Sequence, residues 1–304
     1  MSNSTHTFAA DPRNADIQIN INGDLFPRDK AVVSVFDSGF ILGDGIWEGL
    51  RVHDGVIPFL TQHLKRLWEG AKALDLELGL DRAQLEARLY DTLEANAMRE
   101  HVHIRLMVSR GIKSTPYQDP SFTISPPTIV IIPEYKSPDP TLNDRGVRLY
   151  TVYVRRGYAD VQDPRINSHS KLNCIFGCIQ AAKAGYDEAL MLDVNGFVNT
   201  TNACNFFIVR KGAVWTSTGD YCMNGITRQK VIDLCRENDI PVSERNYSLV
   251  DTYGADEAFL TGTFGAQTPV HSIDGRQIGS GEMGPVTRRI RDLYKGLIAA
   301  EVAQ

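Results

Sequence analysis

Residues 188–217 read EALMLDVNGFVNTTNACNFFIVRKGAVWTS and hold four strand-like apolar runs in direct succession. The runs EALMLD, FVNTT, NFFIVRKG and AVWTS are separated by short polar turns, which is typical of neighbouring strands. The following segment, TRQKVIDLCREN (227–238), has the apolar spacing of a helix. Strands that are grouped with helices, without regular alternation of one strand and one helix, indicate an α+β fold.

The segments around this stretch have the same mixed character. Residues 17–57 contain the strand-like runs IQINING, AVVSVFDS and IWEGLRV, which predict a meander of antiparallel strands. A helix should follow, because apolar residues recur at spacings of four and three at Leu60, Leu64, Leu67, Ala71, Leu74 and Leu78. A second helix opens with Asp81 as its cap, and HVHIRLMVSRG and PTIVIIP read as strands. Further helices are predicted near 171–184 and from about Gly284 onward.

The segment 134–146 separates two groups of predicted elements. It is rich in Pro, Asp and Lys and has no apolar periodicity, so it is predicted to be a linker. A chain of 304 residues is long enough for two cores. We therefore expect a smaller N-terminal α+β domain over 1–133 and a larger C-terminal domain over 147–304.

The composition excludes several classes of function. A net charge of -5 gives no basic surface for nucleic acid, so small molecules are the expected partners. No apolar run is long enough for a membrane span, and the polar first 16 residues do not resemble a signal peptide. An odd number of cysteines, five, fits a reducing cytoplasm. His101 and His103 have no further ligand at a recognised spacing, so no metal site is expected.

Three short segments have the chemistry to bind a phosphate. The first is the turn at residues 225–227, whose backbone N–H groups precede a predicted helix. The second is the hydroxyl-bearing turn at residues 261–263 after the strand-like run AFL, and the third is Arg51, whose guanidinium suits bidentate contact. The glycines of GDGIWEG (43–49) are wrongly spaced for a dinucleotide-binding motif, so that class is disfavoured.

Seven motifs in order resemble one family over most of the chain, from about Ile17 to the end. They are FDSGFILGDGIWEGLRV, QHLKRLWEGAKAL, HIRLMVSRG, GYDEALMLDVNGFV, NGITRQKVI, ADEAFLTGTFG and GPVTRRI. The sequence resembles the class IV aminotransferases, the pyridoxal-phosphate enzymes of fold type IV that include branched-chain, D-amino acid and (R)-amine transaminases. The resemblance implies a two-domain α+β fold, with a smaller N-terminal α/β domain and a β-barrel-like core with flanking helices in the larger C-terminal domain. It also implies a homodimer.

The resemblance assigns roles to individual residues. The cofactor phosphate would be held by Arg51, Gly225, Ile226, Thr227 and Thr263, and Met223 would pack on a face of the pyridine ring. Arg105 and Arg110 match positions where subgroups of the family bind a substrate carboxylate, for which a guanidinium fork is suited. Because these two arginines are five apart on a strand, they should point to opposite faces. At most one should contact substrate, and Arg110 is favoured.

The position of the Schiff-base lysine departs from the family. The family carries this lysine at the end of a segment resembling Asp-Pro-x-x-Lys, but here DPRI (163–166) is followed by Asn167, whose amide cannot form the covalent bond. Lys171 lies four residues later, and in a helix the two side chains would project from one face. The sequence therefore predicts Lys171 as the catalytic lysine. The alternative is that Lys171 is structural and catalysis is lost.

Two further departures concern the cofactor ring. Thr200 stands where the family normally sets a glutamate against the pyridine nitrogen. A hydroxyl would donate a hydrogen bond to an unprotonated nitrogen but would not hold a proton there, so the ring would be a weaker electron sink. The tyrosine that approaches the phenolic oxygen in branched-chain members also has no match, since Phe176 is the next aromatic residue after Lys171. His169 is a candidate polar group at that place.

The expected function is the transfer of an amino group between an amino acid or amine and a 2-oxo acid, with pyridoxal 5'-phosphate as cofactor. Lys171 would bind the cofactor and then move the proton between substrate and cofactor carbons. Two alternatives stay open. Thr200 is compatible with a different pyridoxal-phosphate reaction, such as elimination or racemisation. Asn167 is compatible with a non-catalytic protein that binds a phosphorylated ligand.

Overall fold

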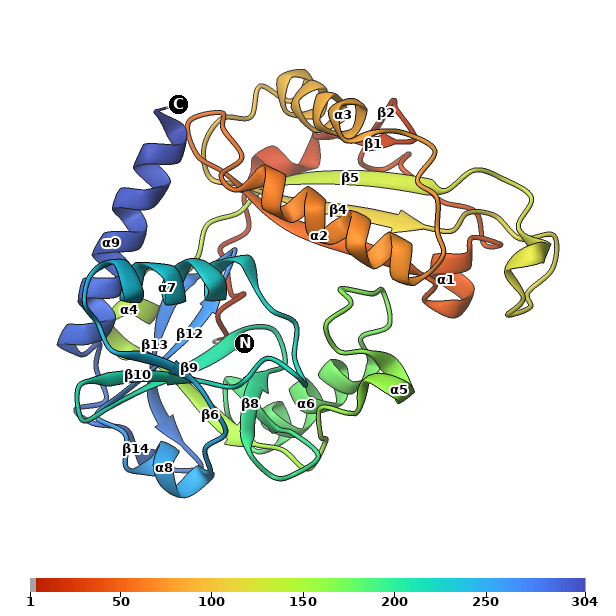
Figure 1. Ribbon diagram of the computed structural model, residues 1–304. Coiled ribbons are helices and arrows are strands. Elements are labelled where there is room, and N and C mark those ends of the chain that lie inside the picture. Colours follow the sequence, from red (N-terminus) through yellow and green to blue (C-terminus); the bar gives the residue numbers. More distant parts are fainter. Residues whose placement is uncertain (1–3, 304) are drawn as a thin grey trace. The chain divides into compact units, whose positions relative to one another are not determined.

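An antiparallel sheet organises the N-terminal half of the chain, in the strand order β2-β1-β5-β4-β3. The computed structural model describes residues 4–303, which form two compact units (Figure 1). The N-terminal unit holds residues 9–137, 166–170 and the last described residues from Glu301, and the C-terminal unit holds residues 4–8, 138–165 and 171–300. The strands of the first sheet are β1 (Gln18–Ile21), β2 (Asp24–Pro27), β3 (Gly45–Val52), β4 (Val102–Ser109) and β5 (Thr128–Tyr135).

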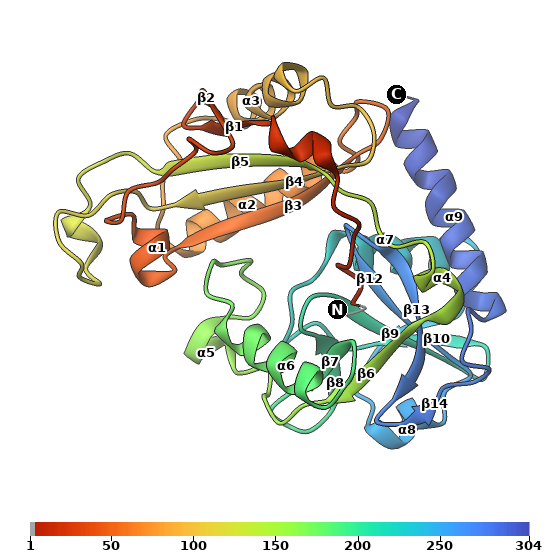
Figure 2. The same cartoon turned by 180° about the vertical axis from the view of Figure 1, so that it is seen from behind.

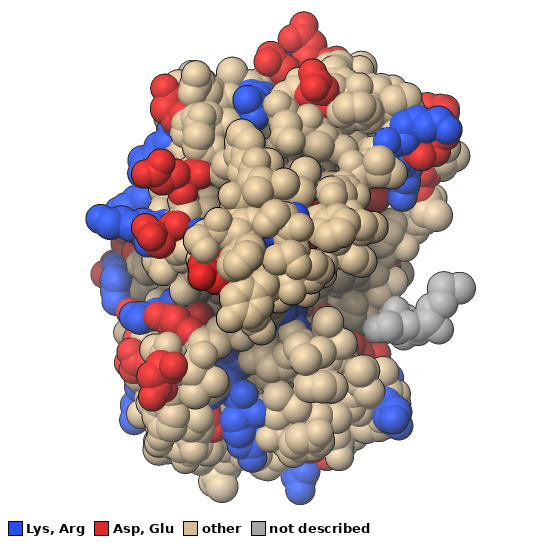
Figure 3. All heavy atoms as spheres, turned by 90° about the vertical axis from the view of Figure 1, so that its right-hand side faces the viewer, with Lys and Arg blue, Asp and Glu red and all other residues tan. Residues whose placement is uncertain are grey.

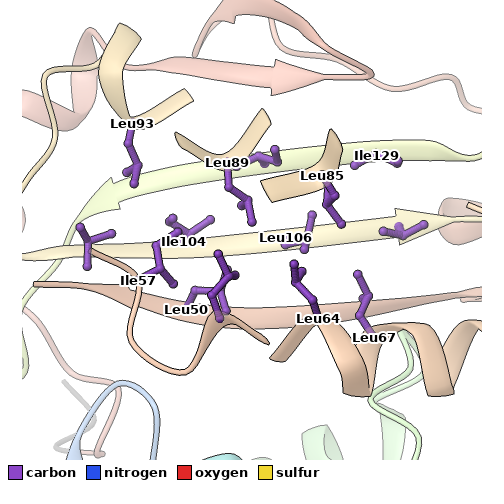
Figure 4. Packing of buried hydrophobic residues seen from close by; sticks show 14 of the residues in the cluster. Leu50, Ile57, Leu64, Leu67, Leu85, Leu89, Leu93, Ile104, Leu106 and Ile129 are labelled. Carbon is purple, nitrogen blue, oxygen red and sulfur yellow. The ribbon is translucent and has the colours of Figure 1, made fainter. Parts of the chain in front are cut away.

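Two helices cover one face of this sheet. They are α2 (Leu60–Ala73) and α3 (Arg82–Ala95), and a short helix α1 (Ser38–Leu42) precedes β3. Alternate residues of β3 and β4, including Leu50 and Ile104, pack against the apolar stripes of the helices in one core (Figure 4). The predicted cap of α3 is confirmed, because the Asp81 side chain accepts from the N–H of Gln84 (2.8 Å) in a capping box.

Three expectations for this half are wrong. Residues 17–57 do not form a meander, because β2 and β3 lie at opposite edges of the sheet and β3 pairs with β4. The run AVVSVFDS forms no strand over residues 31–37, and its valines are exposed, with 76% of Val32 accessible. Alternating apolar residues form a strand only where one face is buried, and here neither is. The first helix ends at Ala73 rather than extending to Leu78, because Asp75 has a positive φ of 50° that cannot continue a helix.

A closed sheet forms the centre of the C-terminal unit. Its order is β11-β10-β9-β12-β13-β6-β7-β8, and an additional pairing of β9 with β8 closes part of it into a barrel (Figure 2). The strands are β6 (Val147–Thr151), β7 (Glu188–Leu192), β8 (Val198–Thr201), β9 (Asn205–Arg210), β10 (Ala213–Thr216), β11 (Val242–Glu244), β12 (Glu257–Gly262), β13 (Ala266–Ile273) and β14 (Arg276–Gln277), which pairs with β13. The helices are α4 (Leu142–Arg145), α5 (Ala159–Gln162), α6 (Leu172–Lys183), α7 (Ile226–Glu237), α8 (Leu249–Tyr253) and α9 (Pro285–Val302).

Both faces of the central strands of this barrel are buried. Phe206 and Ile208 lie in one core cluster, while Phe207 and Val209 lie in a second cluster with residues of α7 and α9. The rings of Phe207 and Phe259, which are register partners on β9 and β12, stack with centroids 5.0 Å apart. Burial on both faces explains why the sequence of β9 is an unbroken apolar run rather than an alternating one.

The expected domain boundaries imply one crossing between the two units, but the chain passes between them several times. One crossing, at residues 137 and 138, falls within the expected linker 134–146, where the short helix α4 begins at Leu142. Residues 4–8 belong to the C-terminal unit and residues 166–170 to the N-terminal unit, so neither unit is one continuous segment. Among residues 4–303, every helix is too short or too polar to cross a bilayer.

A buried ion cluster fixes α2 to β3. Glu48 is fully buried, His63 Nδ1 lies 2.7 Å from its Oε2, and Arg66 Nε donates to its Oε1 at 2.8 Å. Burial would raise the pKa of Glu48, but Arg66 and His63 outweigh burial and hold the pKa below its ordinary value. This stabilisation is therefore present above the ordinary carboxyl pKa and is lost as pH falls through the folded pKa.

Replacing Glu48 by Gln should lower the free energy of unfolding by about 3 kcal/mol at pH 7, because it leaves the guanidinium of Arg66 without its counter-charge. Urea unfolding measures this loss. Glu69→Gln is the matched control, since Glu69 is 66% exposed in its pair with Lys65 and its removal should cost about 0–1 kcal/mol. Equal losses in the two variants would contradict the importance of the Glu48 cluster.

Candidate cofactor site

Asn205, the first residue of β9, connects the predicted site segments of the C-terminal unit. Its Nδ2 donates to the carbonyl oxygen of Met223 (2.9 Å), and a Cβ on Gly225 would lie only 2.4 Å from its Oδ1. In the sheet, Asn205 is the register partner of Thr200 on β8 and of Thr261 on β12. Directly opposed residues point to the same face, so Thr200, Asn205 and Thr261 form one polar row across three strands.

The N-terminus of α7 presents backbone donors beside this row. Gly225 is the N-cap, and no side chain caps the helix there. Thr227 is buried, and Ile226 is half-buried. The first N–H groups of a helix have no intrahelical acceptor, and together with the helix dipole they attract an anion. Asn205 leaves no room for a side chain at 225, so the glycine is required for this close approach.

The hairpin that joins β12 to β13 contributes further polar groups. Thr263 is half-buried in its turn, between Gly262 and Ala266. Thr261 and its register partner Gln267 are both buried, and among the described residues neither Thr261 Oγ1 nor the Gln267 amide has a hydrogen-bond partner. Buried polar atoms without partners are costly in a core and are common at ligand sites. Gln267 lies near the start of β13, and the sequence around it contains no motif that marks it as a site residue.

The hydroxyl of Thr200 donates its hydrogen bond within the protein. Its Oγ1 donates to the carbonyl oxygen of Cys204 (2.8 Å), which also accepts from Thr201 Oγ1 (3.0 Å). The hydroxyl hydrogen of Thr200 is thus engaged within the protein, and its lone pairs remain to accept. The expectation that Thr200 donates to a ring nitrogen is therefore not supported by these contacts.

Asn167 and Lys171 do not lie on one helix, and the prediction that they share a helix face is wrong. The Nδ2 of buried Asn167 donates to the carbonyl oxygen of Trp47 (2.6 Å), whose N–H donates back to the carbonyl oxygen of Asn167 (2.9 Å). This pairing holds residues around 167 in an extended form along β3, which excludes a helix there. Lys171 is half-buried and is the N-cap of α6.

His169 belongs to the same extended segment. Its N–H donates to the carbonyl oxygen of Gly45 (2.9 Å), and its Nε2 lies 3.0 Å from the carbonyl oxygen of Ile46. A Cβ on Gly45 would come within 2.7 Å of the His169 ring, so this glycine makes room for it. Phe176, the next aromatic residue after Lys171, is 46% exposed on α6.

The open face of the N-terminal sheet is cationic. Arg51 on β3 donates from Nη1 to the carbonyl oxygen of Lys136 (2.6 Å). Arg105 on β4 stacks over the Trp47 ring, with its guanidinium carbon 3.8 Å from the ring centroid. Burial lowers the pKa of Lys136, and the nearby charges of Arg105 and Arg51 lower it further, against Glu134. A face on which several cations lie close together is suited to anionic groups.

Arg110 has a different environment. Its Nε donates to Asp44 Oδ2 (2.6 Å), its Nη1 to the carbonyl oxygen of Asp75 (2.9 Å) and its Nη2 to that of Leu74 (2.7 Å). These contacts clamp the end of β4 to the segment that follows α2. Sequence analysis favoured Arg110 over Arg105 as the substrate-binding arginine, and these contacts favour Arg105 instead.

Arg156 is a candidate that sequence analysis missed. It is 8% exposed and forms no ion pair among the described residues, which is unusual for a buried guanidinium. Its Nε donates to the carbonyl oxygen of Tyr221 (3.3 Å), its Nη1 to Cys174 Sγ (3.3 Å) and its Nη2 to the carbonyl oxygen of Pro164 (3.5 Å). Arg156 thus connects the turn before Lys171, the first turn of α6 and the loop that leads to Met223. The only signal in the sequence is an arginine pair directly after the strand-like run GVRLYTVYV.

The residues of the C-terminal unit fit pyridoxal phosphate best at its phosphate end. An uncapped helix N-terminus, a glycine that a side chain cannot replace and an unpartnered hydroxyl at Thr261 together make a donor set for a phosphate monoester. Position 200 carries a hydroxyl in place of the carboxylate that holds the ring nitrogen in the family. In the part of the chain that the structure describes, no group of three His, Cys, Asp or Glu side chains is placed to hold a metal ion.

Comparisons with known proteins agree with this geometry. Residues 45–273 match the family model "Amino-transferase class IV". The chain is 41% identical over 286 residues to branched-chain-amino-acid aminotransferase-like protein 2 of Arabidopsis thaliana, which covers 94% of this chain but only 51% of that protein. It is 38% identical over 284 residues to the putative branched-chain-amino-acid aminotransferase of Methanocaldococcus jannaschii, covering 92% of this chain and 96% of that one.

Solved structures give the same fold. The T.th. branched-chain amino acid aminotransferase complexed with N-(5'-phosphopyridoxyl)-L-glutamate superposes with a TM-score of 0.83 at 29% identity, over 92% of this chain and 93% of that chain. The Escherichia coli branched-chain amino acid aminotransferase superposes with a TM-score of 0.86 at 26% identity, over 93% and 94% of the two chains. The two-domain α+β architecture expected from the sequence is confirmed, and the chain belongs to the class IV aminotransferase family, whose cofactor is pyridoxal 5'-phosphate.

Proposed function

We propose that the chain is a pyridoxal-phosphate-dependent aminotransferase that transfers an amino group between an amino acid or amine and a 2-oxo acid. The observation that carries the proposal is the position of Asn205. Its contacts with Met223 and Gly225, and its pairing with Thr200 and Thr261, support a single site built from segments far apart in the sequence. When bound, the cofactor would supply an electron sink for the substrate's α-carbon.

The residues of the C-terminal unit divide the remaining tasks. The N–H groups of Ile226 and Thr227 and the hydroxyls of Thr227 and Thr263 would hold the phosphate, because the start of α7 offers uncapped donors. Met223 would pack on a ring face, and Asn205 fixes its carbonyl oxygen. Lys171 would be the covalent anchor and would then carry a proton at its Nζ.

Two arginines of the N-terminal unit complete the proposal. Arg51 would contribute to phosphate binding. Arg105 would bind the substrate carboxylate, because its guanidinium is held against Trp47 and its fork of donors matches a carboxylate. Arg110 would support the end of β4 through its bonds to Asp44 and the carbonyl oxygens after α2.

The second candidate is elimination or racemisation with the same cofactor. Thr200 favours it, because this hydroxyl donates to Cys204 and carries no negative charge to keep a ring nitrogen protonated. The two reactions differ in whether they need a 2-oxo acid to accept the amino group. Release of ammonia from an amino acid without a 2-oxo acid would favour elimination, whereas amino transfer that requires the 2-oxo acid would favour transamination.

A homodimer in the cytoplasm is the proposed state. On α6, Leu172, Ile175, Phe176 and Ile179 are spaced as one helical stripe, yet they are 44–61% exposed. An apolar stripe of this kind normally faces a core, and a second copy of the chain is the proposed cover. Figure 3 shows a face of the molecule with broad areas free of charged side chains. Five free cysteines support a reducing compartment.

Borohydride reduction after incubation with pyridoxal phosphate, followed by peptide mapping, should label Lys171. Lys171→Ala should lose the label and lower the rate of amino transfer by at least about 1000-fold, because the covalent anchor and the proton carrier are removed together. Lys183→Ala, at the exposed end of the same helix, is the matched control and should keep both. A parent protein that is not labelled on any lysine would overturn the proposed function.

Gly225→Ala should weaken pyridoxal phosphate binding by about tenfold or more, because a Cβ would press on Asn205 Oδ1 and displace the start of α7. Titration of the apoprotein with cofactor, followed by absorbance, measures this change. Gly296→Ala on α9 is the control, since the added Cβ would meet no described atom within 4 Å beyond its chain neighbours and the helix's own backbone. Unchanged affinity in Gly225→Ala would remove this turn from the phosphate site.

Ile175→Lys should raise the dimer dissociation constant by at least about tenfold, because each copy would place a charge in an apolar contact. Sedimentation equilibrium measures the change. The control is Val250→Lys on α8, which is 77% exposed and outside the α6 stripe. A parent chain that is monomeric at micromolar concentration would contradict the proposed dimer.

A further inference from the structure

Residues 4–8 pack onto the C-terminal unit through Thr5. This threonine is 1% exposed, and its N–H donates to Oε1 of Glu188 at 2.7 Å. Its hydroxyl donates to the same oxygen and lies 3.4 Å from Cys204 Sγ. The ring of His6 stacks on Phe264, the residue after Thr263, with centroids 5.7 Å apart. The segment therefore contacts both Glu188 and the hairpin of the candidate phosphate site.

Glu188 is a buried carboxyl group that is held by neutral donors. It is 1% exposed at the start of β7, and no ion pair involving it is found among the described residues. Its second oxygen, Oε2, lies 3.3 Å from Thr201 Oγ1. Burial raises the pKa of Glu188, against the hydrogen bonds from Thr5 and Thr201. A buried carboxyl group without donors would be costly, which explains why two hydroxyls converge on it.

The hydrogen bonds continue from Glu188 to Thr200. Thr201 Oγ1 accepts from the N–H of Cys204 (2.8 Å), and this bond closes the turn between β8 and β9. The carbonyl oxygen of Cys204 accepts from Thr200 Oγ1 (2.8 Å). Thr5, Glu188, Thr201, Cys204 and Thr200 thus form one connected buried network. Such networks fix side-chain positions because each bond depends on its neighbours.

We propose that Thr5 and Glu188 are positioning residues of the cofactor site, which hold the turn at 201–204 and through it the hydroxyl of Thr200. This inference rests on the proposed function, because it assigns Thr200 to the cofactor ring. Residues 4–8 would then help to position the site, although they lie outside residues 45–273, which match the family model. The network ends at position 200, where this chain lacks the family's carboxylate.

The first test is Thr5→Val, which removes one hydroxyl and keeps the side-chain shape. The expected result is an affinity for pyridoxal phosphate about tenfold lower and a shifted absorption maximum of the bound cofactor, because Thr200 loses its fixed position. Thr5→Ser keeps the hydroxyl, so this variant should have the parent's cofactor affinity and absorption maximum. Thr61→Val is the matched control on an exposed surface of α2 and should leave both unchanged.

The outcomes separate this inference from the proposed function. If the parent binds cofactor on Lys171 and folded Thr5→Val has the parent's affinity and spectrum, the positioning role is wrong while the proposed function stands, even if the melting temperature falls. If the parent does not bind the cofactor, both are overturned. Should Thr5→Val not fold, Glu188→Ala and Glu188→Gln take its place. The amide can accept from Thr5 and donate to Thr201, so it should keep the parent's spectrum, which Glu188→Ala should change.

A second measurement uses the pH dependence of stability. The titratable groups around Glu188 are Asp187, which pairs with Arg148, and the thiols of Cys178 and Cys204, whose pKa values burial raises. His6 also lies in this group, because its Nδ1 is 3.1 Å from the Thr5 Oγ1 that donates to Glu188. Since the folded pKa of Glu188 is raised, its stabilisation is full below the ordinary carboxyl pKa and is lost as pH rises through the folded value. The melting temperature of the parent should therefore fall relative to that of Glu188→Gln as the pH rises above the ordinary carboxyl range. Parallel curves would contradict the raised pKa of Glu188.

Discussion

The amide of Asn205 is the interaction on which the arrangement of the site depends. A side-chain amide has a donor and an acceptor on one rigid plane, so one residue can bond to the loop before α7 and also limit what may stand at position 225. The side chain of Asn205 extends from β9, and this strand is held in place because both of its faces are buried. The turn at 225–227 is thus positioned by a strand that is buried on both faces. Sites on rigid elements hold their geometry better than sites on loops alone.

Each unit has a buried carboxyl group, and the surroundings of the two groups shift their pKa values in opposite directions. The pKa of Glu48 is lowered against its burial, because the guanidinium of Arg66 supplies positive charge and His63 lies within hydrogen-bond distance. Glu188 has only hydroxyl and backbone donors, and its pKa is raised. The first group joins a helix to a strand and tolerates a change of pH toward alkaline values. The second joins a chain segment to a turn and weakens as the pH rises through the raised pKa of Glu188.

Much of the fold could be predicted because burial leaves a regular pattern. The strands β7 to β10, the helix α7 and the cap at Asp81 were all predicted, since periodicity and capping are local properties. The run AVVSVFDS shows the limit, because its alternation is strand-like and only the absence of a neighbouring strand and of burial decides against it. Which strands pair, and that β9 and β8 close the barrel, depends on contacts that no local pattern contains.

The site was predictable only where a short motif marks it. The turns at 225–227 and 261–263 stand out by composition, whereas Asn205, Gln267 and Arg156 are ordinary residues that gain importance from what lies opposite them. The shared helix face of Asn167 and Lys171 could not be predicted for a related reason, since four-residue spacing implies a shared face only if a helix has already begun. The choice between Arg105 and Arg110 likewise depends on which acceptors surround each guanidinium.

The discontinuous composition of the two units constrains how this chain can recombine with its relatives. Residues 4–8 and residues 171–300 belong to one unit, although the whole N-terminal sheet lies between them in the sequence. A single crossover near residues 137 and 138 would keep each sheet whole but would bring together Thr5 of one parent and Glu188 of the other. Exchange of halves therefore preserves both cores and still mixes the two ends of one buried hydrogen-bond network. A double crossover that moves residues 9–137 keeps Thr5 with its own carboxyl partner.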